Sequence, residues 1–80
     1  MNERLKFRGR LLEKEQKSKG LELRLKSLRD SLREHLDPTE DVADLDSEVI
    51  ANDALEFAST HVALREILAD IAAIKKLLGR

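Results

Sequence analysis

The sequence has 80 residues, no cysteine and a formal net charge of −1. Charged residues make up 39% of it and aromatic residues 2%, so we expect a single small all-α domain built from long helices. The lack of cysteine excludes disulfides, cysteine-ligated zinc and thiol nucleophiles. A chain this short buries little surface on folding, and its core is marginal without a partner chain.

The first predicted element is a helix over residues 2–36. Its apolar residues recur at alternating steps of three and four, which places them along one stripe, or seam. They are Phe7, Leu11, Leu21, Leu25, Leu28 and Leu32. Lys14 and Ser18 occupy seam positions in the middle of this stripe. Three explanations stay open: the lysine stem lies along the seam with its ammonium in water, the helix breaks near Gly20, or the polar pair sets register and partner number.

Residues 37–46 are predicted to form an acidic turn. Eight carboxylates and no basic residue occur between residues 37 and 56. Pro38 disfavours helical backbone at the residue before it, so the first helix should end near Leu36. Three side chains could cap the helix that follows. They are Asp44, Asp46 and Ser47.

A second helix is predicted over residues 47–78. Its seam shows the same alternation of steps and contains one charged break, Lys75. The seam residues are Ile50, Ala54, Phe57, His61, Leu64, Leu68, Ile71 and Leu78. If the chain folds back about Asp41, the two seams meet, and the numbers of facing residues sum to about 82. We therefore predict an antiparallel helical hairpin, a coiled coil, and not one continuous helix, which Pro38 opposes.

The apolar face of the second helix is wider than a single partner helix covers. Four residues on or beside its seam are the candidate partner-binding or dimer face: Phe57, Val62, Ile67 and Ile74. A two-helix hairpin also has a small core. We therefore predict self-association, most simply a homodimer that forms a four-helix bundle. Binding to another helical protein is the alternative.

Charge is distributed unevenly along the chain. The net charge is +5 over residues 1–36, −8 over residues 37–56 and +2 over residues 57–80. The hairpin should therefore have an acidic tip and a basic open end. The candidate tip residues are Asp37, Asp41 and Asp44, and the candidate basic residues are Arg4, Arg8 and Arg10. Weak nucleic-acid binding through the basic end is an alternative function, although a solvated helix face with internal ion pairs is the interpretation we favour.

The sequence predicts no catalytic, cofactor or metal site. His35 and His61 should lie roughly 21 Å apart along the hairpin, too far to share a metal ion. Carboxylates alternate over residues 44–48 as they do in a calcium loop, but Val49 and Leu55 stand where that loop needs glycine and glutamate. We expect neither an enzyme nor a small-molecule substrate.

No stretch suggests a membrane or secretory segment. Residues 1–20 contain no long apolar run, and nowhere do 18 apolar residues follow one another. We therefore expect neither a signal peptide nor a membrane span. The cytoplasm is the expected location.

Two segments resemble known families. The tip from Asp37 to Ala43, set between two helical arms, resembles the tip of the DnaK-suppressor and TraR family. That resemblance implies a hairpin that enters the secondary channel of bacterial RNA polymerase, with Asp37 and Asp41 as the working carboxylates. The tip here is one residue longer, and the family's four-cysteine zinc module is missing. Transcription control is therefore an alternative function.

The second resemblance concerns both helices. The run from Asn2 to Leu36, together with the ending IAAIKKLLGR, resembles small uncharacterised helical proteins of Mu-like prophages. This resemblance implies a phage or prophage origin and no particular activity. Taken with the other patterns, it favours a non-enzymatic helical interaction or assembly protein.

Overall fold

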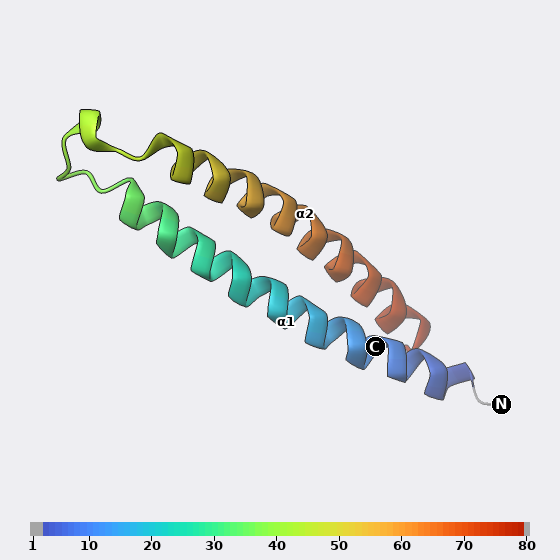
Figure 1. The fold of residues 1–80 in the computed structure, drawn as a ribbon. Coiled ribbons are helices and arrows are strands. Elements are labelled where there is room, and N and C mark those ends of the chain that lie inside the picture. The colour runs from blue at the N-terminus through green and yellow to red at the C-terminus, as the bar shows by residue number, and fades with distance from the viewer. Residues whose placement is uncertain (1–2, 80) are drawn as a thin grey trace.

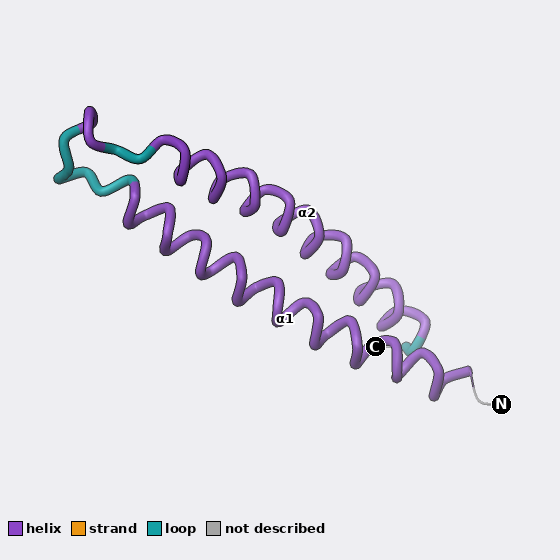
Figure 2. The backbone as a smooth tube through the Cα atoms, in the orientation of Figure 1, coloured by secondary structure: helices purple, strands orange, loops and turns teal. Residues whose placement is uncertain are grey.

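The chain folds as an antiparallel hairpin of two long helices in the computed structural model, which describes residues 3–79. Helix α1 spans Glu3–His35 and helix α2 spans Ser47–Leu77, with the short 3-10 helix η1, Val42–Asp44, at the tip. Figure 1 shows the helices side by side, with the start of α1 and the end of α2 at the end of the hairpin opposite the tip. The hairpin is a rod of 62 × 16 × 15 Å. In Figure 2 the irregular backbone is confined to the tip and the end of α2. The predicted all-α hairpin is confirmed.

The end of α1 follows the predicted stop signal. Leu36 makes the last backbone hydrogen bond of helical type, from its N–H to the carbonyl of Leu32 at 2.9 Å. Asp37 lies outside the helix, because the ring of the following Pro38 disfavours helical backbone at the residue before it. The predicted first residue of this helix, Asn2, lies outside the described residues.

Helix α2 begins and ends at residues suited to capping. Of the three candidate caps, Asp46 is the one used, because its carboxylate accepts a hydrogen bond from the N–H of Val49 at 3.2 Å. At the other end Gly79 adopts a φ of 75°, a left-handed conformation that a Cβ atom would strain. Its N–H donates to the carbonyl of Lys76 at 3.2 Å and closes the last turn.

Replacing Asp46 with alanine is expected to lower the free energy of unfolding by about 1 kcal/mol, because one N–H of the first turn of α2 then loses its acceptor. Asp44→Ala is the matched control two residues earlier, since the Asp44 carboxylate accepts no hydrogen bond within the described chain. Urea denaturation followed by circular dichroism compares the two. Equal losses of unfolding free energy in the two variants would show that the negative charge at the tip contributes to stability and that the capping hydrogen bond of Asp46 does not.

The core lies towards the open end of the hairpin. Its largest cluster of buried apolar side chains comes from one turn of α1 and from the second half of α2 onward. They are Leu11, Ile67, Ile71, Ile74 and Leu78, with Phe7 and Leu21 packed against them. Leu28 and Leu64 are buried further along the seam. Towards the tip the seam is only half-buried, at Leu32 and Ile50 among others.

The predicted seam of α2 is wrong at alternate positions. The seam positions that were predicted correctly recur every seven residues, from Ile50 to Leu78. Between them, the side chains that face α1 are Asp53, Thr60, Ile67 and Ile74, and those left exposed are Ala54, His61, Leu68 and Lys75. Both choices keep steps of three and four. The observed one buries two isoleucines and leaves Lys75 in water, which is favourable because apolar burial stabilises and an unpaired buried charge costs free energy.

The predicted register, by contrast, is confirmed by side-chain contacts between the helices. In four cross-helix hydrogen bonds the two residue numbers add up to within two of 82. The pairs are Arg4 with the Leu78 carbonyl, Lys14 with Asp70, Arg24 with Glu56, and Ser31 with Asp53. Two of them, at Lys14 and Arg24, are ion pairs that the sequence analysis did not anticipate.

Lys14 and Ser18 do lie on the seam of an unbroken helix, which rules out the explanation that the helix breaks near Gly20. Ser18 is buried, and its hydroxyl donates to the carbonyl of Glu15 at 2.8 Å. Lys14 is half-buried, with its ammonium 3.1 Å from the carboxylate of Asp70. The lysine stem therefore covers the seam while its charge stays at the surface, as the first of the three explanations requires.

Candidate interaction surface

Two of the four predicted partner-binding residues are not available to a partner. Ile67 and Ile74 are each only 8% exposed, because they belong to the seam against α1. Phe57 is half-buried, and its ring lies 6.1 Å from that of His61, centroid to centroid. Val62 alone is open to solvent, at 55% of its surface. The predicted face was wrong at Ile67 and Ile74, because every second position of the seam was placed one residue too late on the helix.

Correcting the seam reveals another apolar surface on α2, which we call the α2 outer face. Its members are exposed, mostly small, and on the side of α2 that α1 leaves uncovered. They are Ala51, Ala54, Leu55, Ala58, Val62, Leu68, Ala69 and Ala72. Leu55 is 71% exposed and Leu68 is 45% exposed. Because apolar residues on a helix that already has one covered side suggest a second contact, this face is the candidate site.

The centre of the α2 outer face is slightly hollowed. An open depression there is lined by Val62, Arg65, Glu66 and Ala69, one turn after another along the helix. Arg65 and Glu66 carry opposite charges side by side, so this part of the surface has no net charge. A shallow depression lined by two apolar residues and one pair of opposite charges suits the side chains of another helix.

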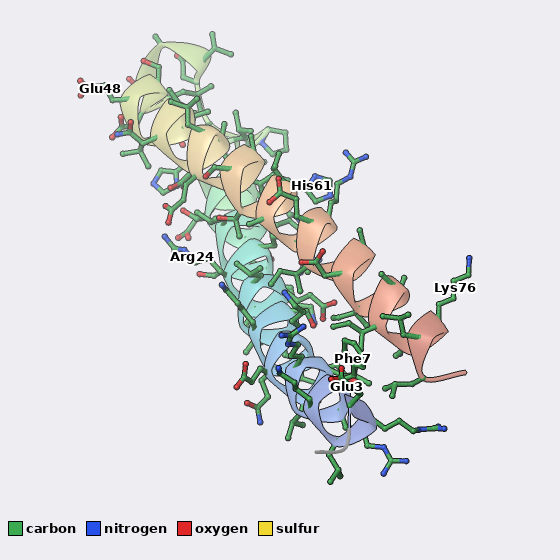
Figure 3. All side chains as sticks on the ribbon, turned by 90° about the vertical axis from the view of Figure 1, so that its right-hand side faces the viewer. Glu3, Phe7, Arg24, Glu48, His61 and Lys76 are labelled. Atoms are coloured by element: carbon green, nitrogen blue, oxygen red, sulfur yellow. The ribbon has the colours of Figure 1, made fainter. Side chains whose placement is uncertain are left out.

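Charged residues mark the two ends of this face. One column along α2 is made of residues that recur every seven positions. They are Glu48, Leu55, Val62, Ala69 and Lys76. Figure 3 labels Glu48 and Lys76, which lie at opposite ends of α2 and project away from the helix. Glu48 lies in the first turn and Lys76 in the last, where each charge also complements the helix dipole.

The predicted acidic tip forms its own hydrogen-bonded turns. Asp37 accepts hydrogen bonds from the backbone N–H and the hydroxyl of Thr39, at 2.9 and 2.7 Å. These bonds favour the carboxylate and hold the pKa of Asp37 below its ordinary value. The free energy of folding that these hydrogen bonds contribute is fully present at pH values above the ordinary pKa of aspartate. It is lost as the pH falls through the lowered pKa of Asp37. Asp41 caps η1 by accepting from Ala43 at 3.1 Å, whereas the Asp44 side chain is exposed.

The predicted basic residues are used in different ways. Arg4 donates to the carbonyl of Leu78 at 3.2 Å and so ties α1 to the end of α2. The guanidinium of Arg10 lies 5.7 Å from the ring centre of Phe7, within the range of a cation–π contact. Arg8 is exposed. The register also brings Lys76 from the last turn of α2 to this end of the hairpin.

The histidines occupy separate places in the hairpin. His35 lies near the tip, with its Nδ1 atom 2.8 Å from the carbonyl of Ser31. His61 lies on the exposed side of α2, about halfway along. Within residues 3–79, no three histidine, aspartate or glutamate side chains converge as a metal site would require. Neither described helix is long and apolar enough to cross a bilayer.

No family model, curated protein or solved structure matches this chain. The resemblances to the DnaK-suppressor and TraR tip and to Mu-like prophage proteins therefore stay predictions.

Proposed function

We propose that this protein is a helical interaction or assembly protein that acts by binding, without chemistry of its own, and that it associates with itself. The observation that supports this most strongly is the α2 outer face. One side of α2 already packs against α1, yet Leu55, Val62 and Leu68 lie exposed on another. A small hairpin gains most from covering such a face, because its own core is limited.

The mass in solution tests self-association. We expect light scattering at micromolar concentration to give about twice the chain mass of 9.1 kDa. Val62→Lys should shift this mass to that of one chain, since it places a charge in the middle of the apolar contact. Leu23→Lys is the matched control, because Leu23 is also an exposed apolar residue but lies on α1. A single-chain mass for the unaltered protein would contradict the proposal.

A second candidate function is weak binding to nucleic acid through the open end. It is favoured by the fold, which gathers Arg8 on α1 and Lys75 and Lys76 on α2 at that end. Contacts of this kind are sequence-independent and weaken steeply with salt. Gel shifts at low and moderate salt, with Arg8→Glu as the variant, test it.

The RNA polymerase effector is a third candidate, supported by the position of the acidic tip at the far end of a long narrow rod. Asp37 and Asp41 both accept hydrogen bonds from the tip's own residues. Their carboxylates would therefore have to keep these bonds while acting in the enzyme channel. Transcription by bacterial RNA polymerase with and without the protein tests this candidate.

A further inference from the structure

The two charges at the ends of the α2 outer face are arranged symmetrically in position and oppositely in sign. Helix α2 spans Ser47–Leu77, and Val62 is its middle residue. Glu48 lies 14 residues before Val62 and Lys76 lies 14 residues after it, in the same column. At 1.5 Å per residue each charge is roughly 21 Å from the centre.

This arrangement is complementary to a second copy of itself turned end for end. If two α2 helices pack antiparallel about Val62, Glu48 of each copy lies beside Lys76 of the other. In a parallel pair, glutamate would face glutamate and lysine would face lysine, and both contacts are repulsive. A two-fold axis through Val62 therefore satisfies both charges at once, as a closed, self-complementary interface requires.

The apolar residues support the same alignment. In the antiparallel arrangement the exposed Leu55 of one copy falls opposite Ala69 of the other, so a large side chain meets a small one. The alanines along the face let the two helix axes approach closely, near the lower end of the usual 8–10 Å. A column repeated every seven residues winds by about 20° per repeat, or about 80° from Glu48 to Lys76, so the two helices must cross at an angle and coil around each other to keep it in contact.

We propose that two copies of this chain dimerise through the α2 outer face in an antiparallel arrangement about Val62, with two Glu48–Lys76 pairs at the ends of the contact. The inference rests on the proposed self-association and adds its partner, surface and direction. Across the interface, the acidic tip of each hairpin lies beside the basic open end of the other.

Single cysteines give the direct test, because the natural chain has none. Leu55→Cys and Ala69→Cys are prepared separately and treated with a short thiol cross-linker, alone and as a mixture. Antiparallel packing predicts cross-linked dimer in the mixture and only background in either variant alone, since identical cysteines would lie roughly 21 Å apart. Val62→Cys should cross-link by itself. Efficient cross-linking of Leu55→Cys alone, or none for Val62→Cys, would overturn the proposal.

Charge reversal gives an independent test. Glu48→Lys and Lys76→Glu should each weaken dimerisation about tenfold at low salt, because two attractive pairs become repulsive. The double variant should return to near the original dissociation constant. It carries both unfavourable helix-dipole changes, so its recovery cannot come from a more stable helix. Sedimentation equilibrium measures each constant, with circular dichroism to check folding.

The matched controls are Lys6→Glu and Glu34→Lys, which change the same charges near the same ends of the hairpin but on exposed positions of α1. They should leave the dissociation constant nearly unchanged. A dimer whose constant is equally insensitive to Glu48→Lys and Lys76→Glu would overturn the antiparallel contact while leaving self-association intact. A single-chain mass for the unaltered protein would overturn the proposed function itself, and the two failures are therefore distinguishable.

Discussion

Replacing Ile71 with alanine should lower the free energy of unfolding by about 2–5 kcal/mol, the largest loss we expect from a single substitution in this chain. Ile71 belongs to the buried cluster at the open end, where it packs with Leu11 and Ile67. Removing its side-chain carbons forfeits their transfer from water and leaves a cavity that two paired helices close only in part. A core this small supplies only a few kcal/mol, so much of the variant should be unfolded.

Urea denaturation followed by far-UV circular dichroism measures this loss, since the chain has no tryptophan or tyrosine to report by fluorescence. The matched control is Leu23→Ala, which removes the same number of carbons from an exposed position on α1. Its change should stay within about 0.5 kcal/mol. Equal effects at the two sites would mean that the cluster does not hold the helices together. Repeating the titrations at several protein concentrations separates folding from association.

Replacing Lys14 with leucine should raise the free energy of unfolding by roughly 1–2 kcal/mol. The lysine stem already lies half-buried on the seam, and leucine would cover the same place with a fully apolar side chain. The substitution gives up the ion pair with Asp70, but a pair this exposed contributes at most about 1 kcal/mol. The gain from apolar burial should therefore exceed the loss.

The control for this substitution is Lys17→Leu, three residues further along α1 at an exposed position. It should leave stability unchanged and lower solubility. If Lys14→Leu also changes the mass measured by light scattering, the lysine helps to set the number of chains in the assembly, as polar seam residues do in coiled coils. An unaltered or reduced stability with an unaltered mass would show that the seam near Lys14 does not accept an apolar side chain.

The sequence by itself determined where the first helix ends, where the second begins and ends, and how the two align. Each boundary depends on a local signal: Pro38 after the first helix, the Asp46 cap before the second, and Gly79 after it. The register follows from the position of the turn, because a short connection centred on Asp41 leaves an antiparallel pair of helices one alignment in which both apolar seams meet. Local backbone chemistry sets the helix boundaries, and chain connectivity together with the apolar pattern sets the register.

Tertiary packing alone decided which side of α2 faces α1. The seam can run through Ile67 and Ile74 or through Leu68 and Lys75, and both choices keep the alternating steps of three and four. A periodic pattern cannot separate them, since they share every seventh residue. Which side faces α1 depends on the total free energy gained from buried apolar area and cross-helix hydrogen bonds. Burying Ile67 and Ile74 is more favourable than burying Leu68 and Lys75, because a buried lysine would lose its hydration. That same choice turns Leu68 outward and so creates the α2 outer face, which the sequence pattern had concealed.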